Sequence, residues 1–173
     1  MTESTLKTHM LPAGHFEIST RKPGADWSPW QVDENLVTLE GRNYLLSAAL
    51  AQGTQKLAFH VAAFSGNVTP QDTWTGANWV ANATEFTNYT EAARQAWNED
   101  AVAAGAVGNA TNPAVFTIGV GGGTIRGFAL VEAQAKGGTT GILFAAARLA
   151  SDKVMSEGEE IRVRYSVSLN NSV

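Results

Sequence analysis

Cysteine is absent from this chain of 173 residues, and charged side chains are scarce. Without cysteine there can be neither a disulfide framework nor a thiolate metal site. Charged residues make up 16% of the sequence, whereas a typical soluble domain has about a quarter. Such a composition fits a surface rich in Thr, Asn, Ala and Gly, or a surface buried in an assembly, since interface cores contain little Lys, Glu and Asp.

Two further absences restrict the partners that this chain can have. The net charge of −4 argues against general nucleic-acid binding, which requires a basic surface. No apolar run approaches the length of about 18 residues that a membrane span requires. Residues 1–10 contain no apolar core segment, so we expect no secretory signal, and synthesis and assembly in a cytoplasm.

The last strand carries the clearest pattern in the sequence. Alternation with a period of two over nine residues predicts an antiparallel strand with one buried and one wet face. The buried face comprises Ile161, Val163, Tyr165, Val167 and Leu169, and the wet face comprises Arg162, Arg164, Ser166 and Ser168.

Gly-rich turns between short strands, without a βαβ rhythm, predict an all-β fold. We expect an antiparallel sandwich, either jelly-roll or immunoglobulin-like, because the sequence does not reveal strand order. Residues 1–14 are polar and predict a flexible arm, and residues 15–173 predict a single domain.

One short helix is predicted over residues 39–52. Thr38 suits the N-cap, and Gly53 suits a left-handed residue at the end of the helix. Four apolar residues share one helix face, which we expect to lie over one end of the sandwich. They are Leu39, Leu46, Ala49 and Leu50.

The other expected strands follow from short apolar or alternating runs. Residues 57–64 and 142–150 are apolar on both faces, which indicates buried, central strands. Gly121–Gly123 predicts a hairpin turn between strands at 115–120 and 124–132. Residues 15–21 and 89–98 are also expected as strands, whereas residues 66–88 form a polar loop long enough to suggest an interaction segment.

The search for catalytic or metal-binding patterns favours none. Gly119–Gly123 lacks the Lys-Ser/Thr pair of a phosphate loop, so it predicts a turn. His9, His15 and His60 have no metal-ligand spacing, and His60 is expected in the core or at an interface. No Gly-x-Ser-x-Gly elbow is present, and the acidic run Glu157–Glu160 predicts a solvated turn. We therefore expect a non-enzyme without cofactor or metal, although paired carboxylates are not visible from sequence.

Aromatic residues and arginines provide the candidate interface. Five tryptophans are present, and exposed indoles anchor protein interfaces or stack on sugar rings, whereas buried ones fill a core. Both interpretations stay open for the loop tryptophans, while Trp97 is expected in the core. The arginines of the last strand either solubilise the wet face or meet acidic residues of a neighbouring subunit. The candidate interface residues are Trp27, Trp30, Trp74, Trp79, Arg162 and Arg164.

Several short stretches occur together in an order that resembles small β-rich structural proteins of tailed bacteriophages. An Ala-rich strand and the alternating last strand follow them. The stretches are Asn-Leu-Val-Thr at 35–38, Gly-Arg-Asn-Tyr-Leu-Leu at 41–46, Gly-Asn-Val-Thr-Pro at 66–70, Tyr-Thr-Glu-Ala-Ala-Arg-Gln-Ala-Trp at 89–97 and Gly-Gly-Thr-Thr-Gly at 137–141.

This resemblance implies a non-enzymatic virion component that is made and assembled in the bacterial host cytoplasm. A capsid decoration (cement) protein comes first: a homo-oligomer, dimer or trimer, that binds the major capsid protein and stabilises the expanded head. A neck, tail or fibre-associated protein is the alternative within the virion. A carbohydrate-binding module, using the tryptophans as sugar platforms, is the rival from another class. Neither nucleic acid nor a membrane is an expected partner.

Overall fold

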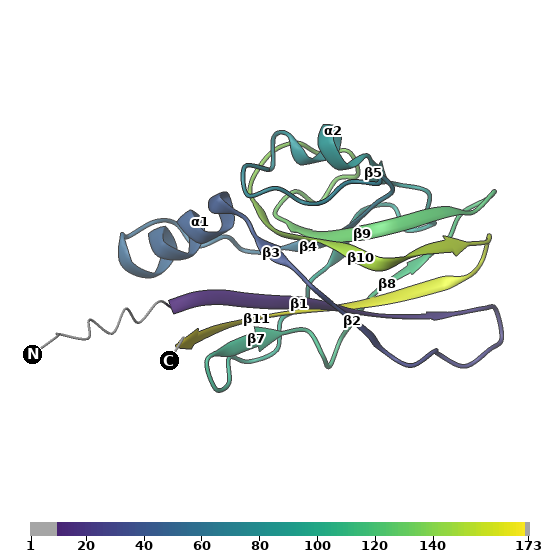
Figure 1. Ribbon diagram of the computed structural model, residues 1–173, viewed down its shortest axis with the longest axis horizontal. Helices are drawn as coiled ribbons and strands as arrows, with labels where there is room; N and C mark the ends of the chain where they lie inside the picture. Colours follow the sequence, from purple (N-terminus) through teal and green to yellow (C-terminus); the bar gives the residue numbers. More distant parts are fainter. Residues whose placement is uncertain (1–9, 172–173) are drawn as a thin grey trace, which may run out of the picture.

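Two antiparallel sheets packed face to face form the body of the protein in the computed structural model, which describes residues 10–171 (Figure 1). The first sheet has the order β2–β1–β11–β7, and β8 also pairs with β11. Its strands are β1 (Met10–Arg21), β2 (Gln31–Glu34), β7 (Ala106–Gly108), β8 (Ala114–Thr117) and β11 (Glu160–Asn171).

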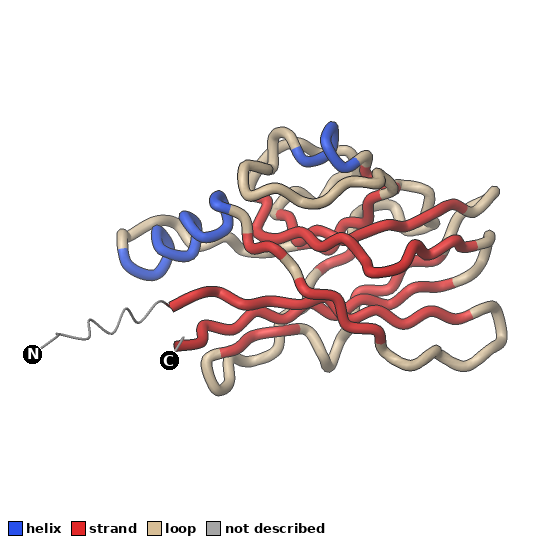
Figure 2. The backbone as a smooth tube through the Cα atoms, viewed as in Figure 1, coloured by secondary structure: helices blue, strands red, loops and turns tan. Residues whose placement is uncertain are grey.

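The second sheet has the order β3–β10–β9–β4–β5, and β6 also pairs with β4. Its strands are β3 (Leu36–Val37), β4 (His60–Phe64), β5 (Glu85–Phe86), β6 (Gln95–Ala96), β9 (Gly123–Val131) and β10 (Leu143–Met155). Two helices, α1 (Leu39–Leu50) and α2 (Trp79–Ala83), complete the fold (Figure 2). The predicted all-β sandwich with a short helix is confirmed.

Strand β11 lies at the centre of the first sheet, between β1 on one side and β7 and β8 on the other. Its alternation is confirmed, because Ile161, Val163 and Tyr165 are fully buried between the sheets. Leu169 departs from the pattern and is 51% exposed, since it lies near the end of the strand where the sandwich opens.

The second sheet is covered on both faces, so the molecule has three layers (Figure 1). Val61 and Ala63 of β4 face the main core between the sheets, whereas Ala62 and Phe64 face a second cluster beneath α2. The segment 66–88 supplies this outer layer. The doubly buried strand expected at residues 142–150 is confirmed for Leu143–Ala147, whereas Arg148 is half-buried and Ala150 is exposed. Of residues 57–64, only β4 forms the expected buried strand, and Leu57 is fully exposed.

The hairpin predicted between residues 115–120 and 124–132 is wrong. Strand β8 pairs with β11 in the first sheet, whereas β9 pairs with β10 and β4 in the second. The glycine turn therefore connects the two sheets. Gly121 and Gly122 have φ of 81° and 67°, so the expected left-handed backbone is present even though the strand partners differ.

The strand expected at 89–98 is reduced to Gln95–Ala96. Side-chain contacts hold the rest of this segment in place of strand hydrogen bonds. The Arg94 side chain is fully buried and forms an ion pair with the buried Glu85 carboxylate at 2.7 Å. Arg94 also donates to the carbonyl oxygens of Ala133 and Gly138 at 2.9 and 3.0 Å. This arginine thereby joins its own segment to β5 and to the loop between β9 and β10 at the edge of the second sheet.

The predicted arm covered residues 1–14, of which residues 1–9 lie outside the described part of the chain. Met10–Gly14 instead belongs to β1 and pairs in register with β11, from Met10 opposite Asn171 to Gly14 opposite Val167. Met10–Gly14 contains Pro12 and Gly14 and shows no alternation of polar and apolar side chains, so nothing in the sequence marked it as a strand. Its pairing depends on ladder hydrogen bonds, which require no such alternation.

Helix α1 begins where the sequence predicted, because the Thr38 hydroxyl accepts from the Gly41 N–H at 3.0 Å. The left-handed residue beyond the helix is Gln52, with φ of 58°, and Gly53 does not take that conformation. The predicted apolar face does not cover the sandwich, because α1 projects past the end of the sheets (Figure 1). Leu46 and Leu50 are 59% and 79% exposed.

Candidate interaction surfaces

Four of the six candidate interface residues gather on the outer face of the first sheet. Arg162 and Arg164 occupy alternate positions of β11, so both side chains leave the sheet on the side away from the core. Trp27 and Trp30 reach the same face from the loop between β1 and β2, and both are half-buried there.

Ser28 holds this loop against β1. Its N–H donates to the Thr20 carbonyl at 2.8 Å, and its hydroxyl accepts from the Thr20 N–H at 3.0 Å. The Ser19 hydroxyl donates to the Ser28 carbonyl at 2.7 Å. Because Ser28 lies between Trp27 and Trp30 in the chain, these bonds keep both indoles close to the sheet.

Guanidinium groups and indole rings alternate in one continuous stack, which we call the Trp–Arg stack. Arg21 lies 4.4 Å from the Trp27 ring centroid, and Arg162 lies 4.5 Å from the same centroid. Arg162 also lies 4.3 Å from the Trp30 centroid, and Arg164 lies 4.0 Å from it. Each such contact stabilises a partly exposed site by about 0.5–1 kcal/mol, so the stack orders the loop.

Two of the three arginines in the stack have acidic partners. Arg21 forms a short ion pair with Glu160, and Arg164 lies 3.5 Å from Glu17. Arg162 has no hydrogen bond or ion pair to any residue in the described part of the chain, and its Nε is buried without a partner. Burial lowers the pKa of Arg162, and the charges of Arg164 and Arg21 act in the same direction.

Trp74 and Trp79, the other two candidates, are only 5% and 1% exposed. Both belong to the cluster beneath α2, where Trp74 packs edge-on against Phe64 at 6.5 Å. Their side chains therefore build the third layer and do not form a surface for partners. Trp97 packs against the main core, as expected, and donates to the Tyr165 carbonyl at 3.1 Å.

A second surface lies at the end of the sandwich where α1 projects. We define this end surface by Leu46, Leu50, Leu57 and Val102, of which Leu57 and Val102 are 101% and 74% exposed. A largely apolar cleft of about 260 Å³ opens here between the two sheets. The residues lining it include Tyr44, Leu57, Phe59, Trp97, Val102 and Val167.

His15 and Ser166 face each other across β1 and β11, and sequence reasoning missed this pair. The Ser166 hydroxyl lies 3.1 Å from His15 Nε2 and 3.3 Å from His15 Nδ1, and Glu17 lies 3.9 Å from Nε2. A nucleophile triad requires the hydroxyl at one ring nitrogen and a hydrogen-bonded acid at the other, whereas this hydroxyl is almost equally far from both nitrogens and Glu17 is beyond hydrogen-bond distance. The arrangement therefore does not build one, and only the strand register could have revealed it.

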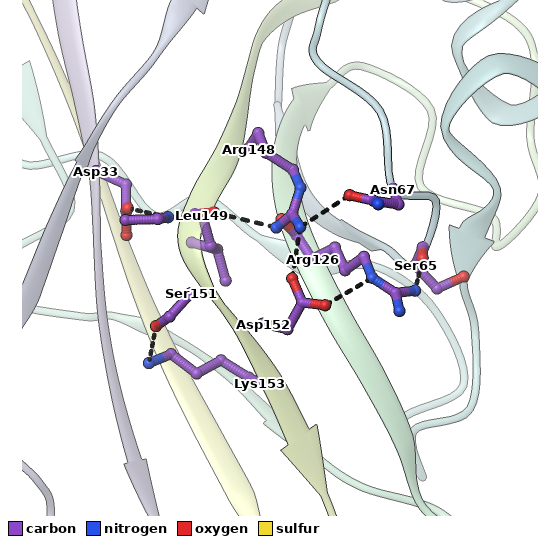
Figure 3. Close-up of polar contacts among 10 residues, drawn as sticks. Asp33, Ser65, Asn67, Arg126, Arg148, Leu149, Ser151, Asp152 and Lys153 are labelled. Atoms are coloured by element: carbon purple, nitrogen blue, oxygen red, sulfur yellow. Dashed lines mark hydrogen bonds and ion pairs between the residues drawn. The ribbon is translucent and has the colours of Figure 1, made fainter.

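Arg126, Arg148 and Asp152 are occupied by structural contacts with one another and with nearby segments. In Figure 3, Asp152 accepts from both Arg126 and Arg148 beside the irregular part of β10 between Arg148 and Lys153. These hydrogen bonds lower the pKa of Asp152, the bond from Arg148 having the largest effect. Arg148 also donates to Asn67 at 3.1 Å, so the network fastens β10 to the 66–88 segment.

Metal and membrane sites were searched for in the same part of the chain. Within residues 10–171, no three His, Asp or Glu side chains gather in a way that would hold a metal ion. Neither of the two helices there has the length and apolar character to cross a bilayer.

No protein-family model matches this chain, and the comparison with curated proteins finds no match. The functional argument therefore depends on the residues themselves.

Proposed function

We propose that this protein is a non-enzymatic bacteriophage virion protein, and specifically a capsid decoration protein that stabilises the expanded head. The order of sequence stretches from Asn35 to Gly141 supports the assignment to phage structural proteins. The β-sandwich fold is compatible with it. The function is binding, and the partner is the major capsid protein or another virion protein.

The end surface is the observation that carries this proposal. Leu57 and Val102 are exposed at the rim of the apolar cleft, and Leu46 and Leu50 are exposed on α1, whose Tyr44 and Leu45 line that cleft. The whole chain has only 16% charged residues. Exposed apolar side chains gathered at one end of a protein are disfavoured in water, and in monomeric proteins such apolar surface marks an interaction site. Contact with the capsid shell would remove this apolar surface from water. Because the shell is symmetric, every bound copy would gain the same stabilisation.

Sugar binding has less support in the structure than protein binding. Trp74 and Trp79 are buried, and both Trp27 and Trp30 carry guanidinium groups within 4.5 Å of their ring centroids. A sugar ring stacks on an open indole face. Arginines already occupy positions over these rings, so we do not propose the carbohydrate-binding module.

Purified virions and isolated expanded heads test the proposal. Quantitative mass spectrometry should find this chain in a simple ratio to the major capsid protein, and the purified protein should sediment with heads that lack it. A few dozen copies or fewer would contradict the decoration assignment and favour a neck, tail or fibre position. Absence from the particle would contradict the virion assignment altogether.

Charge substitutions then test the end surface. Leu50→Asp combined with Leu57→Asp should abolish co-sedimentation without loss of folding, because both side chains are more than three-quarters exposed. Val120→Asp is the matched control, since Val120 is 80% exposed in the turn before β9, at the opposite end of the sandwich. Equal binding by the double variant and the control would contradict the role of this surface.

A further inference from the structure

We propose that the Trp–Arg stack binds a single carboxylate from an acidic side chain of a partner protein, with Arg162 as the anion-binding residue. This inference rests on the proposed function in one respect, namely that the partner is a protein. It adds a second contact surface, on the outer face of the first sheet, and names its chemistry.

The charge balance of the face points to one anionic group. Glu160 pairs with Arg21, and Glu17 pairs with Arg164, which also interacts with the charge of Asp100, whereas Arg162 has no acidic partner within residues 10–171. A polyanion such as nucleic acid would also meet the two glutamates, which repel it at short range. A single carboxylate matches the one guanidinium of the stack that lacks an acidic partner among the described residues.

The donors of Arg162 are available for such a group. Its Nε is enclosed, but the terminal nitrogens are not among the buried atoms and make no hydrogen bond within residues 10–171. The side chain is partly exposed, so a ligand can approach from solvent. A guanidinium presents paired N–H groups in a planar fork that fits the two oxygens of a carboxylate.

The two indoles order the Arg162 side chain already in the unbound protein. Trp27 and Trp30 lie on Arg162 at 4.5 and 4.3 Å, and Ser28 bonds their loop to β1. The guanidinium therefore loses little freedom on binding, and part of its water has already been displaced. Tryptophan and arginine are also the residue types that contribute most to protein interfaces.

Carboxylate binding can be measured without the natural partner. The probes are sodium acetate and a short capped peptide with one glutamate, titrated at constant ionic strength into ¹⁵N-labelled protein. The Arg162 Nε–H signal and the indole N–H signals of Trp27 and Trp30 should shift and saturate. The same peptide with glutamine should leave them unchanged, and no shift with acetate or the glutamate peptide would overturn the inference.

Other anions provide the competing outcomes. Inorganic phosphate and a twelve-nucleotide single-stranded DNA are titrated in the same way. Weaker binding than the glutamate peptide is expected for both. Tighter binding of either would overturn the assignment to a carboxylate and replace it with a phosphate site.

Three variants assign the effect to Arg162. Arg162→Gln should weaken peptide binding at least about tenfold, because a charge-assisted hydrogen-bond pair is lost. Arg162→Lys keeps the charge but removes the fork, so it should bind several-fold more weakly than the wild type. Arg126→Gln is the matched control, since Arg126 pairs with Asp152 on the other sheet and should bind like the wild type. Equal weakening by the control would overturn the assignment.

Binding to expanded heads separates this inference from the proposed function. If heads bind the wild type and Arg162→Gln equally, the partner contact at Arg162 is overturned while the decoration function stands. If heads do not bind the wild type, the decoration function fails, and the peptide titration still decides whether the stack is a carboxylate site.

Discussion

At the scale of single residues, position in the fold decides whether a polar side chain is structural or available. Arg94 and Arg162 illustrate the two cases. Arg94 is fully buried with Glu85 and two carbonyl partners, so its donors are used within the protein. Arg162 is held between two indoles and has no acidic partner in the described part of the chain. Only the second arginine can contribute to binding.

His60 gives a prediction at the same scale. It is 8% exposed, and its Nδ1 lies 3.0 Å from the Glu132 carbonyl oxygen, which the neutral ring can satisfy as donor. Burial lowers its pKa below the ordinary value of 6.5, and the Arg94 charge acts in the same direction, whereas the Glu132 bond opposes them.

The unfolded chain therefore binds more protons than the folded chain between the lowered pKa of His60 and pH 6.5. The free energy of unfolding should therefore fall as the pH falls through this window. Below the lowered pKa, protonation of His60 should cause no further change. Urea unfolding between pH 5 and 8 measures the effect. His60→Asn keeps an N–H donor without titrating, so its stability should depend less on pH, and an unchanged slope would contradict this prediction.

At the scale of elements, α1 is anchored at one end and exposed at the other. Thr38 caps the helix and donates to the Leu143 carbonyl at 2.6 Å, while Glu40 accepts from the Leu143 and Gly76 N–H groups at 2.7 and 2.8 Å. These bonds fix the first turn to β10 and to the 66–88 segment. The last turns extend beyond the sheets and present Leu46 and Leu50.

Gly41 tests this anchoring. Alanine should favour a helix by about 1 kcal/mol over glycine. Its Cβ, however, would overlap the Phe144 carbonyl of β10, so we expect Gly41→Ala to destabilise the protein by about 1–3 kcal/mol in urea unfolding. Asn43→Ala, at an exposed position of the same helix, should change stability by only about a few tenths of a kcal/mol. A stabilising Gly41→Ala would show that α1 does not pack closely on β10.

At the scale of the whole molecule, β1 and β11 pair the first described strand with the last one. They are antiparallel over twelve residue pairs, and β11 also carries Arg162 and Arg164 on its outer face. The strand that pairs with β1 is therefore the strand that positions the Trp–Arg stack. Loss of this pairing should weaken both the fold and the stack.

Two truncations test this coupling. Removing residues 1–14 deletes five register pairs, Met10–Gly14 opposite Val167–Asn171, and should cost several kcal/mol at roughly 1 kcal/mol for each lost ladder hydrogen bond. Removing residues 1–9 leaves β1 intact and should preserve the urea midpoint. Equal midpoints for both truncations would contradict the role of Met10–Gly14. The shorter truncation is also the correct probe of any role for residues 1–9 in binding.

The sequence by itself determined the features that depend on local spacing. The alternation of Ile161–Val167, the cap at Thr38 and the glycine turn at 121–123 are each encoded within a few neighbouring residues. The apolar run Leu143–Ala147 also indicated burial on both faces, because side chains on both sides of a doubly covered strand face apolar surroundings. The all-β sandwich class follows from such local patterns.

Only the tertiary structure decided which distant segments meet. The strand partners of β8 and β9, the burial of Trp74 and Trp79, and the exposed face of α1 depend on contacts between residues far apart in the chain. The same holds for the Trp–Arg stack, which joins a loop at 27–30 to β11 more than 130 residues later. The residues that flank an arginine or a tryptophan in the sequence do not show whether its side chain is buried, paired or free. The contacts that the folded chain brings to that side chain decide which of these it is.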